Sequence, residues 1–154
     1  MQNKLFVKFI CDEMLGSMAK WLRILGYDAK YVKNMEDEEI ARIAREEKRI
    51  LLTRDKKLAS KCKNSVYLEN NGLREQLKKL IKELGLEINE KNLLTRCIIC
   101  NEKIEKIEKE KVKGKVPEHV YESHDEFYVC PRCKRIYWIG THFENMKKFI
   151  ESVK

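Results

Sequence analysis

A short apolar run that ends in an acid occurs twice near the start of this chain, and it constrains the fold more than any other feature. Residues 5–10 are rich in β-forming side chains and lead into Asp12, and residues 50–53 lead into Asp55. Both runs predict buried strands. A carboxylate at the carboxyl end of a buried strand lies where open α/β sheets bind their ligands. Burying even a neutral polar group without a partner costs about 2–7 kcal/mol, so a cation is the natural companion of such an acid.

Helix-like and strand-like segments alternate around these two runs. A helical apolar pattern covers residues 14–25, Gly26 would cap its end, and a half-buried strand is expected over 27–32 with Asp28 facing solvent. A short amphipathic helix begins in the acidic cluster at residues 36–39. The remaining expected segments of this part are a strand at 66–68 and a helix at 73–84. Such alternation predicts an α/β fold with a parallel sheet.

Three aspartates from distant points in the sequence are expected to gather at one edge of that sheet. Because parallel strands point their carboxyl ends the same way, Asp12, Asp37 and Asp55 would share that edge. The acids at residues 36–39 also have a simpler explanation, since a carboxylate at a helix N-terminus gains about 0.3–1 kcal/mol from the helix dipole. The sequence alone leaves both interpretations open.

Four cysteines in the last part of the chain form two C-x-x-C pairs, a pattern typical of a tetrahedral zinc site. The pairs are Cys97 with Cys100 and Cys130 with Cys133, with 29 residues between them. A redox dithiol is the competing explanation, but it needs only one such pair. We therefore expect structural zinc, which would supply much of the folding energy of a tail too small for a core of its own. Cys11 and Cys62 are expected to be ordinary thiols.

The rest of the tail is expected to contain short strands and one helix. A hairpin is expected near Ile104 and Ile107, and β-like arms are expected on both sides of the second cysteine pair. Thr141 is a suitable N-cap for a last helix whose apolar residues begin at Phe143. His142 either contacts a phosphate or a substrate, or merely stabilises the turn.

The composition restricts the classes of function. The 154 residues carry a net charge of +8, and 38% of them are charged, which suits a polyanionic partner such as RNA and equally suits simple solubility. No apolar run reaches the ~18 residues that a membrane span needs. The first residues lack the basic, apolar and small-residue phases of a signal peptide. We therefore expect a cytoplasmic location without a membrane partner, where cysteines stay reduced.

Clustered carboxylates, a basic chain and two cysteine pairs together suggest metal-assisted cleavage of nucleic acid. Carboxylate oxygens hold Mg²⁺ or Mn²⁺, and such an ion activates water and neutralises charge on a phosphate. Lys20, Arg23 and Arg54 lie near the acids in the sequence and are candidates to bind backbone phosphates. The alternative for Lys20 and Arg23 is that they only solvate the exposed face of the first helix.

Taken together, several motifs resemble the Mut-seven C-terminal ribonuclease family, a branch of the PIN-like nucleases with an attached zinc ribbon. The resemblance runs along nearly the whole chain. Its carriers are Asp12-Glu13-Met14-Leu15-Gly16, Trp21-Leu22-Arg23, Leu25-Gly26-Tyr27-Asp28, Asp37-Glu38-Glu39-Ile40, residues 50–55, Arg96-Cys97, Cys100-Asn101, residues 130–133, Tyr137-Trp138, Gly140 and His142.

The resemblance implies a PIN-like, three-layer α/β/α nuclease domain over residues 1–94 and a zinc ribbon with a C-terminal helix over 95–154. It also implies metal-dependent RNase activity, with Asp12, Asp37 and Asp55 as the acidic triad, and it favours a functional role for His142 and Trp138.

One departure from the family pattern concerns a fourth acid, which PIN-like sites often carry shortly after the third. Here Lys56 and Lys57 follow Asp55, so Glu13 or Glu38 would have to take that place.

Two functions are therefore weighed. The first is a Mg²⁺- or Mn²⁺-dependent ribonuclease that cleaves RNA at the three aspartates, and the second is a non-catalytic RNA- or ribosome-associated zinc-ribbon protein with vestigial acids. A third class, a phospho-acceptor signalling domain, is opposed by the two cysteine pairs and by the lack of a second acidic pair with a later strand-end lysine. A regulatory protein partner is compatible with the first two.

Overall fold

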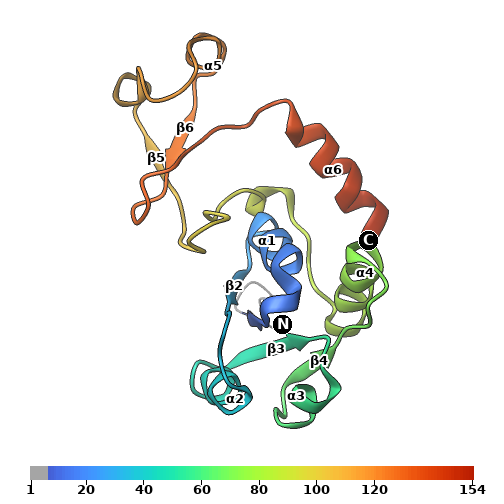
Figure 1. Ribbon diagram of the computed structural model, residues 1–154. Helices are drawn as coiled ribbons and strands as arrows, with labels where there is room; N and C mark the ends of the chain where they lie inside the picture. Colours follow the sequence, from blue (N-terminus) through green and yellow to red (C-terminus); the bar gives the residue numbers. More distant parts are fainter. Residues whose placement is uncertain (1–6) are drawn as a thin grey trace.

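The computed structural model describes residues 7–154 and contains a four-stranded parallel sheet in the order β2-β1-β3-β4 (Figure 1). The expected strand at residues 5–10 lies partly outside the described residues and is observed as β1. The last residue of β1, Cys11, pairs with Tyr31 on one side and with Leu52 on the other. The strands are β1 (Lys8–Cys11), β2 (Asp28–Tyr31), β3 (Arg49–Thr53) and β4 (Ser65–Tyr67).

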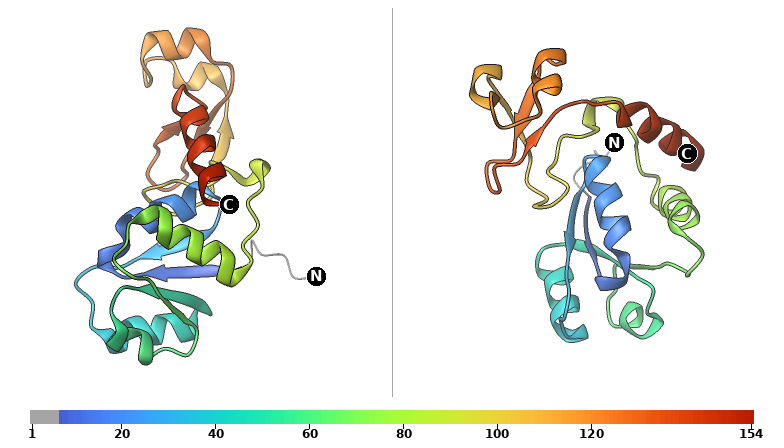
Figure 2. Two further views of the ribbon diagram at one scale, coloured as in Figure 1. Left: turned by 90° about the vertical axis from the view of Figure 1, so that its right-hand side faces the viewer. Right: turned by 45° about the horizontal axis from the view of Figure 1, so that its top comes forward.

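Helices cover both faces of this sheet, which confirms the predicted three-layer α/β/α fold (left view of Figure 2). Successive residues of β1 enter different layers, because side chains alternate along a strand: Phe9 packs with α1 and α4, and Ile10 packs with α2 and α3. A strand buried on both faces needs a continuous apolar run, as its sequence has. The helices are η2 (Glu13–Leu15), α1 (Gly16–Ile24), α2 (Asp37–Glu46), α3 (Lys56–Ser60) and α4 (Leu73–Leu84).

The C-terminal part contains a second, antiparallel sheet in the order β5-β6-β7. The hairpin expected near Ile107 is not observed, since β5 pairs with β6 across a long insertion that contains η4 and α5. The expectation that this tail has no core of its own is wrong, because Val112, Val120 and Phe127 form a small buried cluster inside it. The elements are η3 (Glu90–Asn92), β5 (Glu105–Ile107), η4 (Lys109–Val112), α5 (Glu118–Ser123), β6 (Phe127–Val129) and β7 (Ile136–Tyr137).

The last helix, α6 (His142–Val153), returns to the first part of the chain and packs beside α4 (Figure 1). Ile150 and Val153 are buried in the same core cluster as α1 and α4, and the ring of Phe149 lies 4.4 Å from that of Trp21. We call residues 96–139 the cysteine module, since α6 belongs to the α/β core by its packing. None of the helices within residues 7–154 is long and apolar enough to cross a membrane.

Candidate active site and cysteine cluster

The three predicted aspartates line one cavity at the carboxyl edge of the parallel sheet. Asp12 follows β1, Asp37 opens α2 after β2, and Asp55 follows β3, so each acid comes from a different strand end. The cavity has a volume of about 300 Å³. It lies at the point where β1 and β3 are neighbours but their following helices lead to opposite sides of the sheet, which is the usual ligand position in open α/β folds.

Asp12 is the most buried of the three acids, with only 7% of its surface exposed. Its Oδ1 accepts a hydrogen bond from the backbone N–H of Met14 (3.1 Å), and its Oδ2 accepts one from the hydroxyl of Thr53. Burial raises the pKa of Asp12 above its ordinary value, and the charges of Asp55 and Glu13 raise it further against those two hydrogen bonds. A cation bound next to this carboxylate would therefore stabilise its charged form.

Thr53 also orients Asp55, a link that the sequence analysis missed. The backbone N–H of Asp55 donates to the Thr53 hydroxyl (2.9 Å), and the Asp55 carboxylate accepts from the N–H groups of Lys57 (2.8 Å) and Leu58 (3.3 Å). Asp55 thus caps α3, a short helix that was not expected. A threonine two residues before a strand-end aspartate is the local signal that could have indicated this arrangement.

Asp37 has a cationic neighbour, Lys61, which directly follows the last residue of α3. The Lys61 ammonium lies 3.8 Å from Asp37 Oδ2 and 2.9 Å from Glu38 Oε1. The hydrogen bond to Glu38 is the main reason that the pKa of Lys61 is raised. Of the two acids considered for the fourth position, Glu13 lines the cavity, while Glu38 is directed to Lys61.

The carboxylates line one cavity without forming a tight cluster. Within residues 7–154, the four cysteines are the only group of three or more potential metal ligands whose atoms all lie within 4.8 Å of one another. Asp12, Asp37 and Asp55 are not such a group, although all three line one cavity. Two asparagines, Asn34 and Asn70, also line the cavity and add amide oxygens to the set of hard donors.

The four residues predicted to bind substrate are found in three different places. Arg54 lines the acidic cavity. Lys20 and His142 line a second cleft between α1, the cysteine module and α6. Arg23 is only 9% exposed and donates to the backbone carbonyls of Ala29 (2.9 Å) and Ile98 (2.9 Å). The alternative that Arg23 only solvates an exposed helix face is wrong, because the cysteine module covers this side chain.

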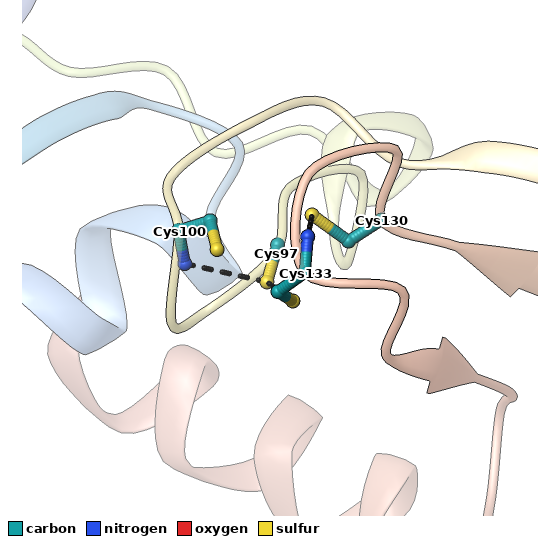
Figure 3. Close-up of side chains that lie close together, drawn as sticks. All are labelled: Cys97, Cys100, Cys130 and Cys133. Carbon is teal, nitrogen blue, oxygen red and sulfur yellow. Dashed lines mark hydrogen bonds between the residues drawn. The ribbon is translucent and has the colours of Figure 1, made fainter.

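The four cysteines meet between two loops, as predicted from their spacing (Figure 3). The sulfur atoms of Cys97 and Cys133 lie 3.7 Å apart, and a tetrahedron with Zn–S bonds of about 2.3 Å has S–S edges of about 3.8 Å. Backbone N–H groups donate to two of the sulfurs, from Cys100 to Cys97 (3.3 Å) and from Cys133 to Cys130 (3.4 Å). The donor set and its geometry fit a zinc ion.

The two cysteine loops share one backbone design. In each, the residue after the second cysteine has a positive φ, 67° at Asn101 and 66° at Lys134, and its N–H donates to the carbonyl of the first cysteine (2.9 Å in both). This left-handed turn lets the N–H groups of the second cysteines, Cys100 and Cys133, point at the sulfurs of the first cysteines, Cys97 and Cys130. Glycine is the residue that adopts such a conformation at the lowest cost.

The first cysteine loop is attached to the free edge of β2. The side-chain oxygen of Asn101 accepts from the N–H of Ala29 (3.0 Å), and its amide nitrogen donates to Asp28 Oδ1 (2.6 Å). Asp28 also pairs with Arg49 (2.7 Å), so the expectation that Asp28 faces solvent is wrong. Burial alone would raise the pKa of Asp28, but the hydrogen bonds from Arg49 and Asn101 outweigh it and leave the pKa below its ordinary value.

The fold and these sites define an α/β protein with a carboxylate cavity at its strand ends and an attached four-cysteine centre. Sequence comparison narrows this class: the chain matches the Mut7-C RNAse domain over residues 7–150 and belongs to that family. A human protein named exonuclease mut-7 homolog is 32% identical over 101 residues, which cover 61% of this chain. The match covers 12% of the human protein's length, so this chain corresponds to a small part of it. No solved structure matches the chain.

Proposed function

We propose that this protein is a nuclease that hydrolyses RNA phosphodiester bonds at the cavity lined by Asp12, Asp37 and Asp55. Membership of the Mut7-C RNAse domain family supports a nuclease. The observation that carries the assignment to this cavity is that the ends of β1 and β3 and the start of α2 each contribute a carboxylate to it. The human exonuclease mut-7 homolog is a relative over part of its length and agrees with the same class of activity.

The cavity's hard oxygen donors fit Mg²⁺ or Mn²⁺, and Asp12, Asp37 and Asp55 would hold the ion. A bound ion of this kind lowers the pKa of its water and neutralises charge on the phosphate. Glu13 is the acid in position to serve as a fourth ligand, since it lines the same cavity. Burial and, to a smaller extent, the charges of Asp55 and Glu13 raise the pKa of Asp12, so a divalent cation would stabilise the charged form of this carboxylate.

The protein's own groups would position the substrate and the acids. Arg54 lines the cavity and can bind a phosphate next to the scissile bond with its guanidinium. Thr53 holds the carboxylate of Asp12 and the backbone of Asp55 together, and the first turn of α3 holds the carboxylate of Asp55. The orientation of two acids is thereby set before any ligand arrives, which is a requirement for a precise catalytic site.

Hydrolysis of a labelled RNA oligonucleotide with added Mn²⁺ tests this proposal. Asp12→Asn keeps the size of the side chain but removes the negative charge, and we expect it to abolish cleavage. Asp125→Asn is the matched control, because Asp125 is 97% exposed in the cysteine module and its loss should leave cleavage unchanged. Equal cleavage by wild type and Asp12→Asn would contradict the proposal.

A non-catalytic RNA-binding role is the second candidate, and one observation favours it. Lys61 lies within 4 Å of Asp37 and the three aspartates do not form a closed cluster, so the cavity already has some charge compensation without an ion. This alternative predicts salt-sensitive RNA binding that Asp12→Asn leaves unchanged or strengthens, with no metal-dependent cleavage by the wild type.

A further inference from the structure

A second cleft, larger than the acidic cavity, separates α1 from the cysteine module and the start of α6. Its volume is about 610 Å³, and it is lined by residues of α1, η3, β6, β7 and α6. In Figure 1 the segment that follows β7 passes above α1 on its way to α6, and this segment forms one wall of the cleft. The cleft brings together Lys20 and His142, which are 122 positions apart in the sequence.

Aromatic side chains and unpaired cations meet in this cleft. Tyr128, Trp138 and Phe143 line it, and all three are partly exposed. Lys20 and Lys91 lie at the same surface, and neither has a carboxylate within 4 Å in the part of the chain that the structure describes. The acid of the cleft, Glu90, is already paired with Lys147 at 2.8 Å. The surface therefore offers partly exposed aromatic side chains next to the positive charge of Lys20 and Lys91, and one of these rings, Phe143, already has Lys147 lying over it at 5.3 Å.

We propose that this cleft binds unpaired nucleobases of a single strand, which stack on its aromatic side chains while Lys20 and Lys91 contact the flanking phosphates. A single-stranded nucleic acid combines flat π faces with a regular negative charge, and stacking platforms beside basic side chains are the usual means of binding it. The site is separate from the acidic cavity, but the inference rests on the proposed function in that it takes nucleic acid as the ligand.

The cleft is connected to the acidic cavity by α1. This helix follows Glu13, which lines the cavity, and carries Lys20 and Ile24, which line the cleft. The nine-residue helix from Gly16 to Ile24 is about 13.5 Å long at 1.5 Å per residue. A strand several nucleotides long can therefore contact both sites, whereas a dinucleotide can contact only one. The cleft would increase the affinity for long substrates without taking part in the chemistry.

Fluorescence of Trp138 tests the proposal directly. The chain has two tryptophans, and Trp21→Phe leaves Trp138 as the sole reporter while it keeps an aromatic contact with Phe149. We expect oligo(U) to quench this emission with no divalent ion added, and inorganic polyphosphate to leave it largely unchanged because it has no bases. Oligo(dT) distinguishes an RNA-specific cleft from one that accepts any single strand.

Substitutions in the cleft test how much each side chain contributes to the binding of oligo(U). Trp138→Leu should weaken oligo(U) binding, followed by anisotropy, about 5- to 150-fold, the range that corresponds to the loss of one base stack. Lys20→Gln should reduce the slope of log K against log salt by about 0.7, the value for one phosphate contact on a single strand. Lys113→Gln is the matched control, since it removes an exposed lysine of the cysteine module outside the cleft.

Any of three binding results would overturn the proposal, and the state of association gives a fourth: saturable binding by anisotropy with no change in Trp138 emission, equal quenching by polyphosphate, or no binding of either oligonucleotide. Quenching that accompanies dimerisation of the protein alone would identify a second copy as the occupant, and would also overturn it. None of these measurements requires turnover. Asp12→Asn should bind oligo(U) in the cleft as the wild type does, so failure of the cleavage proposal and failure of this one are distinguishable.

Discussion

The buried hydroxyl of Thr53, at the end of β3, donates a hydrogen bond to Oδ2 of Asp12, at the end of β1. The same hydroxyl accepts from the backbone N–H of Asp55. One uncharged side chain therefore determines how two of the three acids are placed, although it contributes no ligand charge of its own. This arrangement makes Thr53 a positioning residue whose effect can be measured apart from the chemistry.

Thr53→Val removes the hydroxyl while it nearly keeps the volume of the side chain. We expect the pKa of Asp12 to rise further, because its hydrogen bond from Thr53 lowers that pKa against burial. A hydrogen bond to a charged group contributes about 1.5–3 kcal/mol, so the free energy of unfolding at pH 7 should fall by about that amount. NMR titration of the Asp12 carboxyl carbon and denaturant unfolding measure the two effects.

Thr53→Ser is the control for that substitution, since it keeps a hydroxyl at the same position and should restore most of the wild-type titration. An unchanged titration of Asp12 in Thr53→Val would show that the hydrogen bond has no electrostatic effect on the site.

Asp12→Asn should stabilise the protein at neutral pH in the absence of divalent ions. The pKa of Asp12 is raised in the folded state, chiefly by burial, so its charged form costs stability once the pH exceeds that pKa. The stability that the protonated form provides is fully present below the ordinary aspartate pKa of about 3.9 and is lost as the pH rises through the folded value. We expect a higher Tm than that of the wild type at pH 7, measured by thermal unfolding.

The gain should disappear below pH 3.9 or so, where wild-type Asp12 is also neutral. Asp125→Asn, at an exposed position, should show no such gain at either pH. A Tm for Asp12→Asn at or below that of the wild type at pH 7 would argue that the acid is already compensated.

Zinc should be present at one ion per chain, and its removal should unfold the cysteine module. Structural zinc contributes about 10–16 kcal/mol in small zinc domains, far more than the cluster of Val112, Val120 and Phe127 can provide. Cys97→Ser should therefore lose the metal by elemental analysis, whereas Cys62→Ser, which changes a cysteine outside the cluster, should retain it. Folded, metal-free protein after chelation would contradict this expectation.

Lys134→Gly should stabilise the second cysteine loop. Lys134 has a φ of 66°, a left-handed conformation that costs a residue with a Cβ about 1 kcal/mol more than glycine. We expect the variant to resist chelator and heat better, with a gain of about 1 kcal/mol measured by thermal unfolding. Lys113→Gly is the matched comparison: Lys113 has a φ of −57°, so glycine there should lower stability slightly.

The local patterns in the sequence were sufficient to predict the parallel sheet, the position of the three aspartates around one cavity and the close approach of the four cysteines. These features depend on the alternation of strand and helix segments, on the common direction of parallel strands and on the spacing of the cysteines. The first and the last are local patterns in the sequence, and the second follows from the topology of a parallel sheet. The two free thiols were also predicted correctly, with Cys11 buried and Cys62 partly buried.

Features that depend on contacts between distant segments were not predictable in this way. The sequence pattern places Asp28 at a solvent-facing strand position, and only the contact with Asn101, 73 residues later, shows that it is covered. Arg23 has the helical position of a surface residue, and only the loop at Ile98 buries it. The short helix α3 was missed because its five residues carry little periodicity and its stability depends on the cap that Asp55 provides.

The return of α6 to α4 decides which piece of this chain can be expressed or exchanged. A fragment that ends before residue 142 would lose Ile150 and Val153 from the core they share with Leu77 and Leu80, and it would present that apolar patch to other molecules. A swap of the cysteine module between relatives therefore has to replace residues 96–139 internally and leave α6 in place. Because α6 shares its core with β1, α1 and α4, a label near the C-terminus would report on the integrity of the sheet that carries the acids.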